Sequence, residues 1–289
     1  MLPQPALDLL ASHYGAPPGE LAPTFGGFSH HSALATIGGR RCVVKAAEAT
    51  PKRADLRHEA RVLELLRGSG LPAPALLALA EDAGWTVELL EFVPGANGLH
   101  ILASEPAALD LVYGALGRTL AAVHGAALAH PAQDLLLAGR AAQLHAALAE
   151  LPLDADLRIA LAAGLEQPAW RSPDVRLVHG DAGIHNLLWD GRITALLDWE
   201  WAGWGDPLID LAWVWWTMRW RDLPGRLWPV FLAGYAAERP APVADPATLR
   251  ALALGEIAGI LARVYGQAGA WAEWLRRARW TLALDVAPA

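Results

Sequence analysis

Short runs of alternating hydrophobic and polar residues characterise the first third of the chain and predict strands there. Residues 33–37 and 41–45 form two such runs, and the Gly38-Gly39 pair between them favours a tight turn. Residues 53–66 follow, with hydrophobic side chains at helical spacing at Leu56, Ala60, Leu63 and Leu66. The pattern therefore predicts a β-hairpin followed by an amphipathic helix.

Helical patterns dominate the chain beyond Pro94-Gly95. The predicted helices cover residues 105–127, 133–150, 206–219, 224–237 and 246–265. A length of 289 residues suits two lobes around one cleft. We therefore predict an α+β, two-lobed fold: a small antiparallel β-rich lobe with one helix over residues 1–94, and a larger, mainly helical lobe over residues 95–289.

A second predicted hairpin carries polar residues at both ends. Residues 186–189 and 193–197 are apolar runs separated by Asp190-Gly191, a dipeptide that favours a tight hairpin turn. Pairing of the two runs brings Asn186 and Asp198 to the same end of the hairpin.

The spacing of polar residues around this hairpin is typical of a phosphoryl-transfer site. His179-Gly180-Asp181 follows a short predicted strand at residues 175–178, and on such a loop the Asp181 carboxylate can accept a proton from an attacking hydroxyl. Asn186 and Asp198 offer the hard oxygen ligands that Mg²⁺ shares with a bound nucleotide. The alternative for the same residues is a surface β-hairpin with two polar ends.

Rare residue types single out Asn186 and Lys45. The chain contains two asparagines, and two lysines among 23 basic residues. A lysine where arginine is otherwise used suggests that a compact ammonium is needed, and Lys45 ends the predicted strand at residues 41–45. Glu59 could hold this ammonium from the following helix; the alternative is an exposed carboxylate paired with an arginine.

A glycine-containing loop precedes the first predicted hairpin. Gly26, Gly27 and Ser29 lie in this loop, and glycines there allow backbone N–H groups to approach phosphates closely. The loop lacks a complete G-x-G-x-x-G pattern and is weak evidence by itself.

Taken together, these motifs resemble the aminoglycoside phosphotransferase and choline kinase superfamily, which comprises small-molecule kinases with a protein-kinase-like fold. The family pattern H-G-D-x-x-x-x-N is matched by His179, Gly180, Asp181 and Asn186, and the metal-binding Asp by Asp198. The pattern G-D-P-x-x-D-L-A is matched at residues 205–212, and the lobe-connecting E-x-x-x-G at residues 91–95. Two departures are His30, where the family often has Asn, and residues 182–185, which replace L-H-P-G.

The resemblance implies a role for each matched residue. Asp181 is expected to be the catalytic base, and Asn186 and Asp198 to bind Mg²⁺. The residues expected around ATP, or GTP, are Lys45, Glu59, Gly26, Gly27, Ser29, Glu91 and Val93. Further candidates are His179, which would orient the catalytic loop, Asp210, which would brace it, and Glu200, which would bind metal through water or pair with an arginine.

Composition narrows the classes of partner and compartment. A net charge of −7 without a basic run argues against nucleic acid. The apolar stretches at residues 111–129 and 252–265 carry charged or histidine side chains, so no membrane span is expected. The single Cys42 and the lack of a signal-peptide pattern favour a reducing, cytoplasmic location. Neither His30-His31 nor His179 with His185 comes with a cysteine partner or an H-E-x-x-H pattern, so zinc is not expected.

The acceptor is expected to be a small molecule with a hydroxyl group, and its identity stays open. Residues 201–289 contain eight acidic and nine basic residues, which weakens the case for a polycationic aminoglycoside. Seven of the fourteen tryptophans lie at positions 199, 201, 204, 213, 215, 216 and 220. Core packing is their ordinary role, with Trp201 and Trp204 as candidates for binding a choline-like or glycosidic acceptor.

Two other classes of function compete with a small-molecule kinase. A catalytically silent nucleotide-binding protein would not need Asp181, Asn186, Asp198 and Lys45 all intact. A protein kinase would need an activation segment after the metal-binding Asp, whereas Gly205-Asp206-Pro207 follows Asp198 within a few residues. The choice between ATP and GTP as phosphoryl donor stays open, as does the oligomeric state.

Overall fold

The structure is a computed structural model that describes residues 2–15, 17–24, 30–128 and 135–286. The chain forms two compact units: unit 1 comprises Met1–Val112 and Ile184–Trp201, and unit 2 comprises Tyr113–Gly183 and Ala202–Ala289. The predicted division of function between residues 1–94 and 95–289 stays a prediction.

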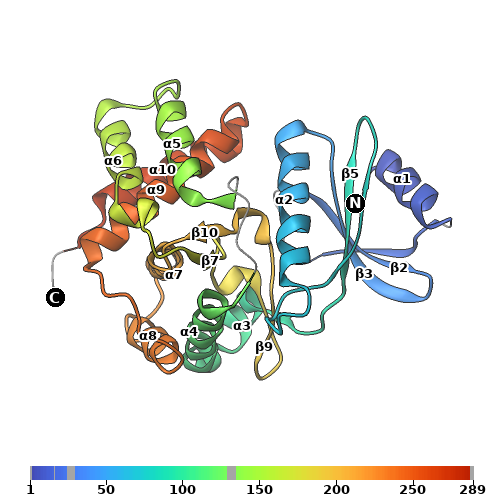
Figure 1. Cartoon of the computed structure of the whole chain (residues 1–289), viewed down its shortest axis with the longest axis horizontal. Helices are drawn as coiled ribbons and strands as arrows, with labels where there is room; N and C mark the ends of the chain where they lie inside the picture. Colours follow the sequence, from blue (N-terminus) through green and yellow to red (C-terminus); the bar gives the residue numbers. More distant parts are fainter. Residues whose placement is uncertain (1, 16, 25–29, 129–134, 287–289) are drawn as a thin grey trace. The chain divides into compact units, whose positions relative to one another are not determined.

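Unit 1 contains a five-stranded antiparallel sheet in the order β1-β2-β3-β5-β4 (Figure 1). Its strands are β1 (Gly19–Pro23), β2 (His31–Ile37), β3 (Arg40–Ala47), β4 (Leu76–Glu81) and β5 (Thr86–Glu91). The predicted hairpin is confirmed as β2 and β3, and its turn glycines Gly38 and Gly39 have φ values of 57° and 77°. Only glycine adopts two consecutive positive φ angles without steric cost, which explains the pair.

Two helices cover opposite faces of this sheet (Figure 1). Successive strand side chains point to opposite faces, so Cys42, Val44 and Ala46 of β3 share one face and Lys45 lies on the other. Helix α1 (Gln4–Tyr14) packs its Ala6 and Leu10 with the Cys42 face. Helix α2 (Thr50–Leu66) covers the Lys45 face.

The helix at residues 53–66 is therefore confirmed, whereas the prediction of one helix in this region was wrong. Helix α1 escaped prediction because two buried residues one turn apart, Ala6 and Leu10, make a weak pattern.

A smaller sheet in unit 1 carries the second predicted hairpin. Strands β8 (Leu187–Trp189) and β9 (Ile193–Leu196) pair antiparallel, with Gly191 at φ 68° in the turn, as predicted. Strand β6 (Ala96–Asn97) pairs with β8, and α3 (Gly98–Ser104) follows directly.

Unit 2 is mainly helical. Its helices are α4 (Leu109–Gly125, which begins in unit 1), α5 (Leu137–Leu148), α6 (Ala155–Leu165), α7 (Leu208–Trp220), α8 (Leu227–Ala236), α9 (Pro246–Val264) and α10 (Ala268–Ala283). Strand β7 (Arg176–Val178) pairs antiparallel with β10 (Gly203–Gly205). No helix in the described residues is both long enough and apolar enough to span a bilayer.

The structure corrects the helix predictions for this region in two ways. The helix predicted at 105–127 is split, because Glu105 leaves helical geometry and Pro106 starts a short 3-10 turn before α4 begins at Leu109. Helices α6 and α10 were not predicted.

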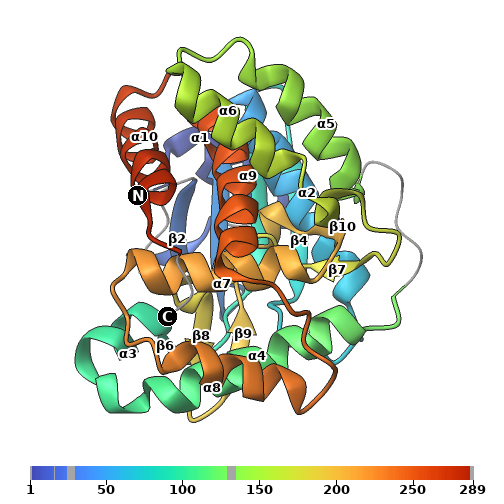
Figure 2. The same ribbon diagram turned by 90° about the vertical axis from the view of Figure 1, so that its left-hand side faces the viewer.

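Helix α9 lies at the centre of unit 2, in contact with α5, α6, α7 and α10 (Figure 2). Gly164 on α6 faces Gly255 on α9, and a Cβ added to Gly164 would lie 2.5 Å from the Ala251 carbonyl oxygen and 2.6 Å from the Gly255 nitrogen. The two backbones approach so closely because neither residue has a side chain. A core of buried hydrophobic residues extends from this crossing and includes Trp213 and Trp216 of α7.

We expect Gly164→Ala to destabilise unit 2 by about 1–3 kcal/mol, because the methyl group would push α6 away from α9. Gly139→Ala is the matched control, since this exposed position in α5 has no atom within 4 Å of an added Cβ, and it should stabilise the protein by about 0.5–1 kcal/mol. Urea unfolding of both variants measures the difference. Equal stability of the two variants would contradict the close helix crossing.

Candidate active site

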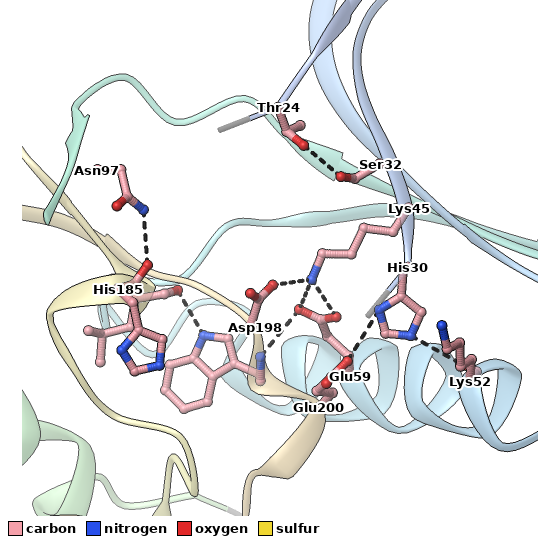
Figure 3. A network of polar contacts seen from close by, with 12 residues as sticks. Thr24, His30, Ser32, Lys45, Lys52, Glu59, Asn97, His185, Asp198 and Glu200 are labelled. Atoms are coloured by element: carbon pink, nitrogen blue, oxygen red, sulfur yellow. Dashed lines mark hydrogen bonds and ion pairs between the residues drawn. The ribbon is translucent and has the colours of Figure 1, made fainter. Parts of the chain in front are cut away.

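Lys45 is the centre of a buried ion network in unit 1 (Figure 3). Its Nζ donates to both carboxylate oxygens of Glu59, at 2.8 and 2.7 Å, and to Asp198 Oδ1 at 2.6 Å. The side chains of Lys45 and Glu59 are 11% and 0% exposed, while that of Asp198 is 43% exposed. The lysine is thus held from α2 on one side and from the segment after β9 on the other.

The carboxylates keep this ammonium charged. Burial alone would lower the pKa of Lys45, but the negative charges of Asp198 and Glu59 raise it well above its ordinary value. Glu88 lies opposite Lys45 in the β3–β5 ladder and is fully buried. Burial and the neighbouring charge of Glu59 raise the pKa of Glu88 well above its ordinary value.

Asp198 adopts a backbone conformation that is unusual for a residue with a side chain. Its φ is 60°, in the left-handed region, which aspartate tolerates better than most residues. The next residue, Trp199, donates its backbone N–H to Glu59 Oε1 at 3.3 Å and its indole N–H to the Leu196 carbonyl at 2.9 Å. These contacts hold the strained turn and direct the Asp198 carboxylate toward Lys45.

The hairpin places Asn186 beside the same segment. Asn186 is 5% exposed, and its backbone carbonyl accepts a hydrogen bond of 2.8 Å from the N–H of Leu197, the residue before Asp198. Its amide oxygen and the Asp198 carboxylate are the hard donors that Mg²⁺ prefers, so the residues present fit this ion.

The other asparagine has a structural role. Asn97 donates from Nδ2 to the His185 carbonyl at 3.0 Å and accepts from the Leu99 N–H at 2.9 Å, capping α3 (Figure 3). It therefore holds the backbone next to Asn186.

In unit 2, the carboxylate of Asp181 lies on the loop after β7. Trp213 of α7 donates its indole N–H to Asp181 Oδ1 at 2.6 Å. The loop itself is held by Asp210, whose Oδ2 accepts from the His179 N–H at 2.7 Å and whose Oδ1 accepts from the Gly180 N–H at 2.8 Å. Both side chains come from the same helix, so α7 positions the loop and orients its carboxylate.

Asp210 is itself part of a buried chain of hydrogen bonds. His124 Nε2 donates to Asp210 Oδ2 at 2.9 Å, and His124 Nδ1 lies 2.8 Å from the Tyr235 hydroxyl. Burial by itself would raise the pKa of Asp210, but the hydrogen bonds and positive potential of His124 and His179 outweigh it and lower the pKa. Asp210 is therefore ionised at neutral pH although it is fully buried.

Glu256 on α9 is a second buried carboxyl group in this unit. It is 3% exposed, and Arg140 Nη2 lies 3.8 Å from its Oε2. Burial raises the pKa of Glu256 to about 7 against the lowering effect of the Arg140 charge, and the charges of Asp210 and Asp181 act in the same direction as burial.

Sequence reasoning missed Trp213, His124, Glu88 and Glu256. Trp213 was assigned to the core with the other tryptophans. The hydrogen bond from its indole N–H to Asp181 distinguishes it from them. A charged residue within an otherwise apolar strand or helix pattern was the available signal for Glu88 and Glu256.

The remaining predicted residues are placed as follows. Gly26, Gly27 and Ser29 lie outside the described residues. Glu91 ends β5 and pairs with Arg40 at 3.3 Å at the surface, and Val93 lies half-buried two residues beyond. Trp201 is half-buried in unit 1, whereas Trp204 is 6% exposed in β10 of unit 2. Their functional roles stay predictions, as do those of Asp181, Asn186 and Asp198.

Comparison with known proteins identifies the family. Residues 21–279 match the model of the phosphotransferase enzyme family, and the chain belongs to this family of kinase-type enzymes. This finding confirms the superfamily that the sequence motifs indicated.

One curated relative matches most of this chain over a small part of that relative's own length. Acyl-CoA dehydrogenase family member 10 of Mus musculus is 27% identical over 236 residues, which are 73% of this chain and 22% of that protein. The chain thus spans about a fifth of the length of this relative.

Solved structures share the fold. Aminoglycoside phosphotransferase APH(4)-Ia, a thermostable mutant in complex with ADP and hygromycin B, is 20% identical with a TM-score of 0.69 over 96% of this chain and 97% of that one. Macrolide 2'-phosphotransferase MphH from Brachybacterium faecium is 22% identical with a TM-score of 0.63 over 99% of each chain. These matches confirm the predicted α+β, protein-kinase-like fold.

We expect Glu256→Gln to change how stability depends on pH. The pKa of Glu256 is raised in the folded state from 4.5 to about 7, so the folded state binds more protons than the unfolded state between these values. Its stabilising contribution is therefore complete below pH 4.5 and lost as the pH rises through about 7, a change of about 3 kcal/mol.

The glutamine variant should lack this loss and gain stability relative to the parent protein over the same pH range. Glu238→Gln, at an exposed position of the same unit, is the control. Urea unfolding at a series of pH values makes the comparison. Parallel curves for Glu256→Gln and the parent protein would show that Glu256 does not titrate in this range.

Proposed function

We propose that this protein transfers the γ-phosphoryl group of ATP or GTP to a hydroxyl group of a small organic acceptor. The observation that carries the proposal is the enclosed Lys45, which is paired at once with Glu59 on α2 and with Asp198 after β9. Phosphoryl transfer depends mainly on positioned charge, and this network fixes a cation and an acidic metal ligand next to each other.

In unit 1, each residue of the network has a separate task. Lys45 would contact the α- and β-phosphates, and Glu59 would hold its ammonium in place. Asn186 and Asp198 would hold Mg²⁺, which when bound neutralises charge on the phosphate oxygens. The loop with Gly26, Gly27 and Ser29, and the segment with Glu91 and Val93, are proposed to contact the nucleotide.

In unit 2, Asp181 would orient the acceptor hydroxyl and take its proton. The indole N–H of Trp213 fixes one oxygen of this carboxylate, which reduces its rotational freedom before the acceptor binds. Asp210 holds the backbone on the N-terminal side of Asp181, so the base sits on a rigid loop. His179 supports the same loop, since its Nδ1 accepts the Asp181 N–H at 3.3 Å.

We propose an acceptor of the kind used by aminoglycoside phosphotransferases, with a choline-, ethanolamine- or homoserine-type metabolite as the alternative. The complex of a structural relative, APH(4)-Ia, with hygromycin B supports the first class. In unit 2 several tryptophan faces are already covered: Trp213 stacks on Trp216, and Arg277 lies 4.5 Å from the Trp274 ring centre. A quaternary ammonium would therefore depend on other rings, such as Trp201 or Trp204.

A catalytically silent nucleotide-binding protein is the alternative from another class of function. The intact set of Lys45, Asp181, Asn186 and Asp198 favours catalysis. The single buried thiol of Cys42 and the need for a nucleoside triphosphate favour the cytoplasm. Nucleic acid and membranes are not proposed as partners.

We expect Asp181→Asn to lower turnover by roughly 10²–10⁴-fold and to leave nucleotide affinity unchanged, because the amide cannot accept the proton. The assay follows nucleotide consumption with Mg²⁺ and ATP or GTP over aminoglycosides, macrolides, amino alcohols, homoserine and amino sugars. Asp190→Asn, in the exposed hairpin turn, is the control. Near-normal turnover of Asp181→Asn would remove it as the base, and nucleotide binding without any turnover of the parent protein would favour the silent alternative.

We expect Glu59→Gln to raise the KM for the nucleotide by roughly tenfold, equivalent to about 1.4 kcal/mol, because an amide holds the ammonium less firmly than a carboxylate. Glu64→Gln is the matched control on the same helix, since Glu64 pairs with Arg67 at the surface. Steady-state kinetics with varied nucleotide concentration measures both. The same KM in the two variants would contradict the proposed role of Glu59.

A further inference from the structure

Three side chains far apart in sequence converge beside the Lys45 network in unit 1. Each of His30, Asp55 and Glu200 offers one donor atom, and these atoms all lie within 4.8 Å of one another. His30 precedes β2, Asp55 lies one turn before Glu59 on α2, and Glu200 lies in the 3-10 turn after Asp198. Figure 3 shows the His30 ring next to the Glu200 carboxylate at the edge of the network.

The hydrogen bonding of His30 determines which nitrogen faces the carboxylates. His30 Nε2 lies 3.3 Å from the backbone carbonyl of Lys52, and a carbonyl can only accept, so Nε2 carries the hydrogen. In the neutral ring Nδ1 then presents a lone pair, and it is Nδ1 that faces Glu200. Histidines that bind metals typically donate their second N–H to a carbonyl or carboxylate in this way.

The distance between Nδ1 and Glu200 also suits a shared cation. At 3.4 Å it is longer than the usual N–H···O hydrogen bond of about 2.9 Å. Metal–ligand bonds of about 2.0–2.2 Å in a tetrahedral site place neighbouring donor atoms about 3.3–3.5 Å apart. The side chains of His30 and Glu200 are only 6% and 8% exposed, so water screens the carboxylate poorly and a cation between the donors stabilises it.

We propose that His30 Nδ1 and the carboxylates of Asp55 and Glu200 bind one divalent first-row transition metal ion, of which Zn²⁺ is the representative. An imidazole nitrogen among the donors favours Zn²⁺ over Mg²⁺, which prefers oxygen. The site is separate from the Asn186 and Asp198 donors and does not depend on the proposed phosphoryl transfer. It joins the start of β2, helix α2 and the segment after β9, and therefore stabilises unit 1 when occupied.

The sequence did not indicate this site, because its donors follow no short metal-binding pattern and the neighbouring His31 does not take part. His31 is exposed and packs its ring against Trp85 at a centroid distance of 5.8 Å. It provides a matched control next to His30 in the chain.

The test is metal binding by the full-length protein after treatment with a chelator. Isothermal titration calorimetry with Zn²⁺ gives the stoichiometry, and excess Mg²⁺ in the buffer saturates sites made of oxygen donors alone. The visible absorption spectrum of bound Co²⁺ reports the ligand geometry. We expect one ion per chain, a higher unfolding temperature with Zn²⁺, and a tetrahedral Co²⁺ spectrum. His30→Ala and Asp55→Asn should each weaken binding by roughly 100-fold or more, while His31→Ala should not.

Other outcomes overturn the proposal. No saturable binding by the parent protein, or equal binding by the parent protein, His30→Ala and Asp55→Asn, would show that His30, Asp55 and Glu200 do not form a metal site. If His30→Ala does not fold, as judged by circular dichroism, His30→Gln tests the same nitrogen with a polar side chain of similar reach.

Discussion

The charge of Lys45 is the constraint around which unit 1 is organised. An ammonium that is nearly enclosed by protein remains charged only if carboxylates are held close to it, and Glu59 and Asp198 meet this requirement from two different segments. Removing one partner from a buried pair such as Lys45–Glu59 typically costs about 3–5 kcal/mol, and the 43% exposed Asp198 adds a weaker, more solvent-screened contact from the segment after β9. In the proposed function, the same arrangement would supply a cation for a phosphate group and a carboxylate for its metal ion.

Unit 2 also contains a buried carboxylate, but there it holds a loop in place instead of pairing with a lysine. Asp181 must be held in one orientation, and a second buried carboxylate, Asp210, provides this by binding two consecutive backbone N–H groups. His124 and Tyr235 extend the support into α4 and α8. The position of the proposed base therefore depends on the packing of several helices and not on its own loop alone.

The sequence predicted most of this structure where the signals were local. Both hairpins, helix α2 and the residues of the H-G-D motif were recognisable, because glycine pairs, alternation and motif spacing act over a few residues. Helices α1 and α10 were missed although each buries two residues, Ala6 and Leu10 in α1 and Ala278 and Thr281 in α10, and α6 was missed because its sequence is nearly continuously hydrophobic. The properties of Glu88 and Glu256 and the hydrogen bond of Trp213 depend on residues that are distant in sequence. They arise from burial in the folded protein, which a single amino-acid sequence does not show.

The tryptophan cluster of unit 2 has a spectroscopic consequence. Trp213 binds Asp181 through its indole N–H, and its ring stacks on Trp216 with centroids 4.6 Å apart and on Trp274 with centroids 6.4 Å apart. Nearly parallel indoles at these distances couple their electronic transitions. A change in the charge or position of the Asp181 carboxylate alters this coupling, so the protein carries its own near-ultraviolet circular dichroism reporter at the proposed catalytic base.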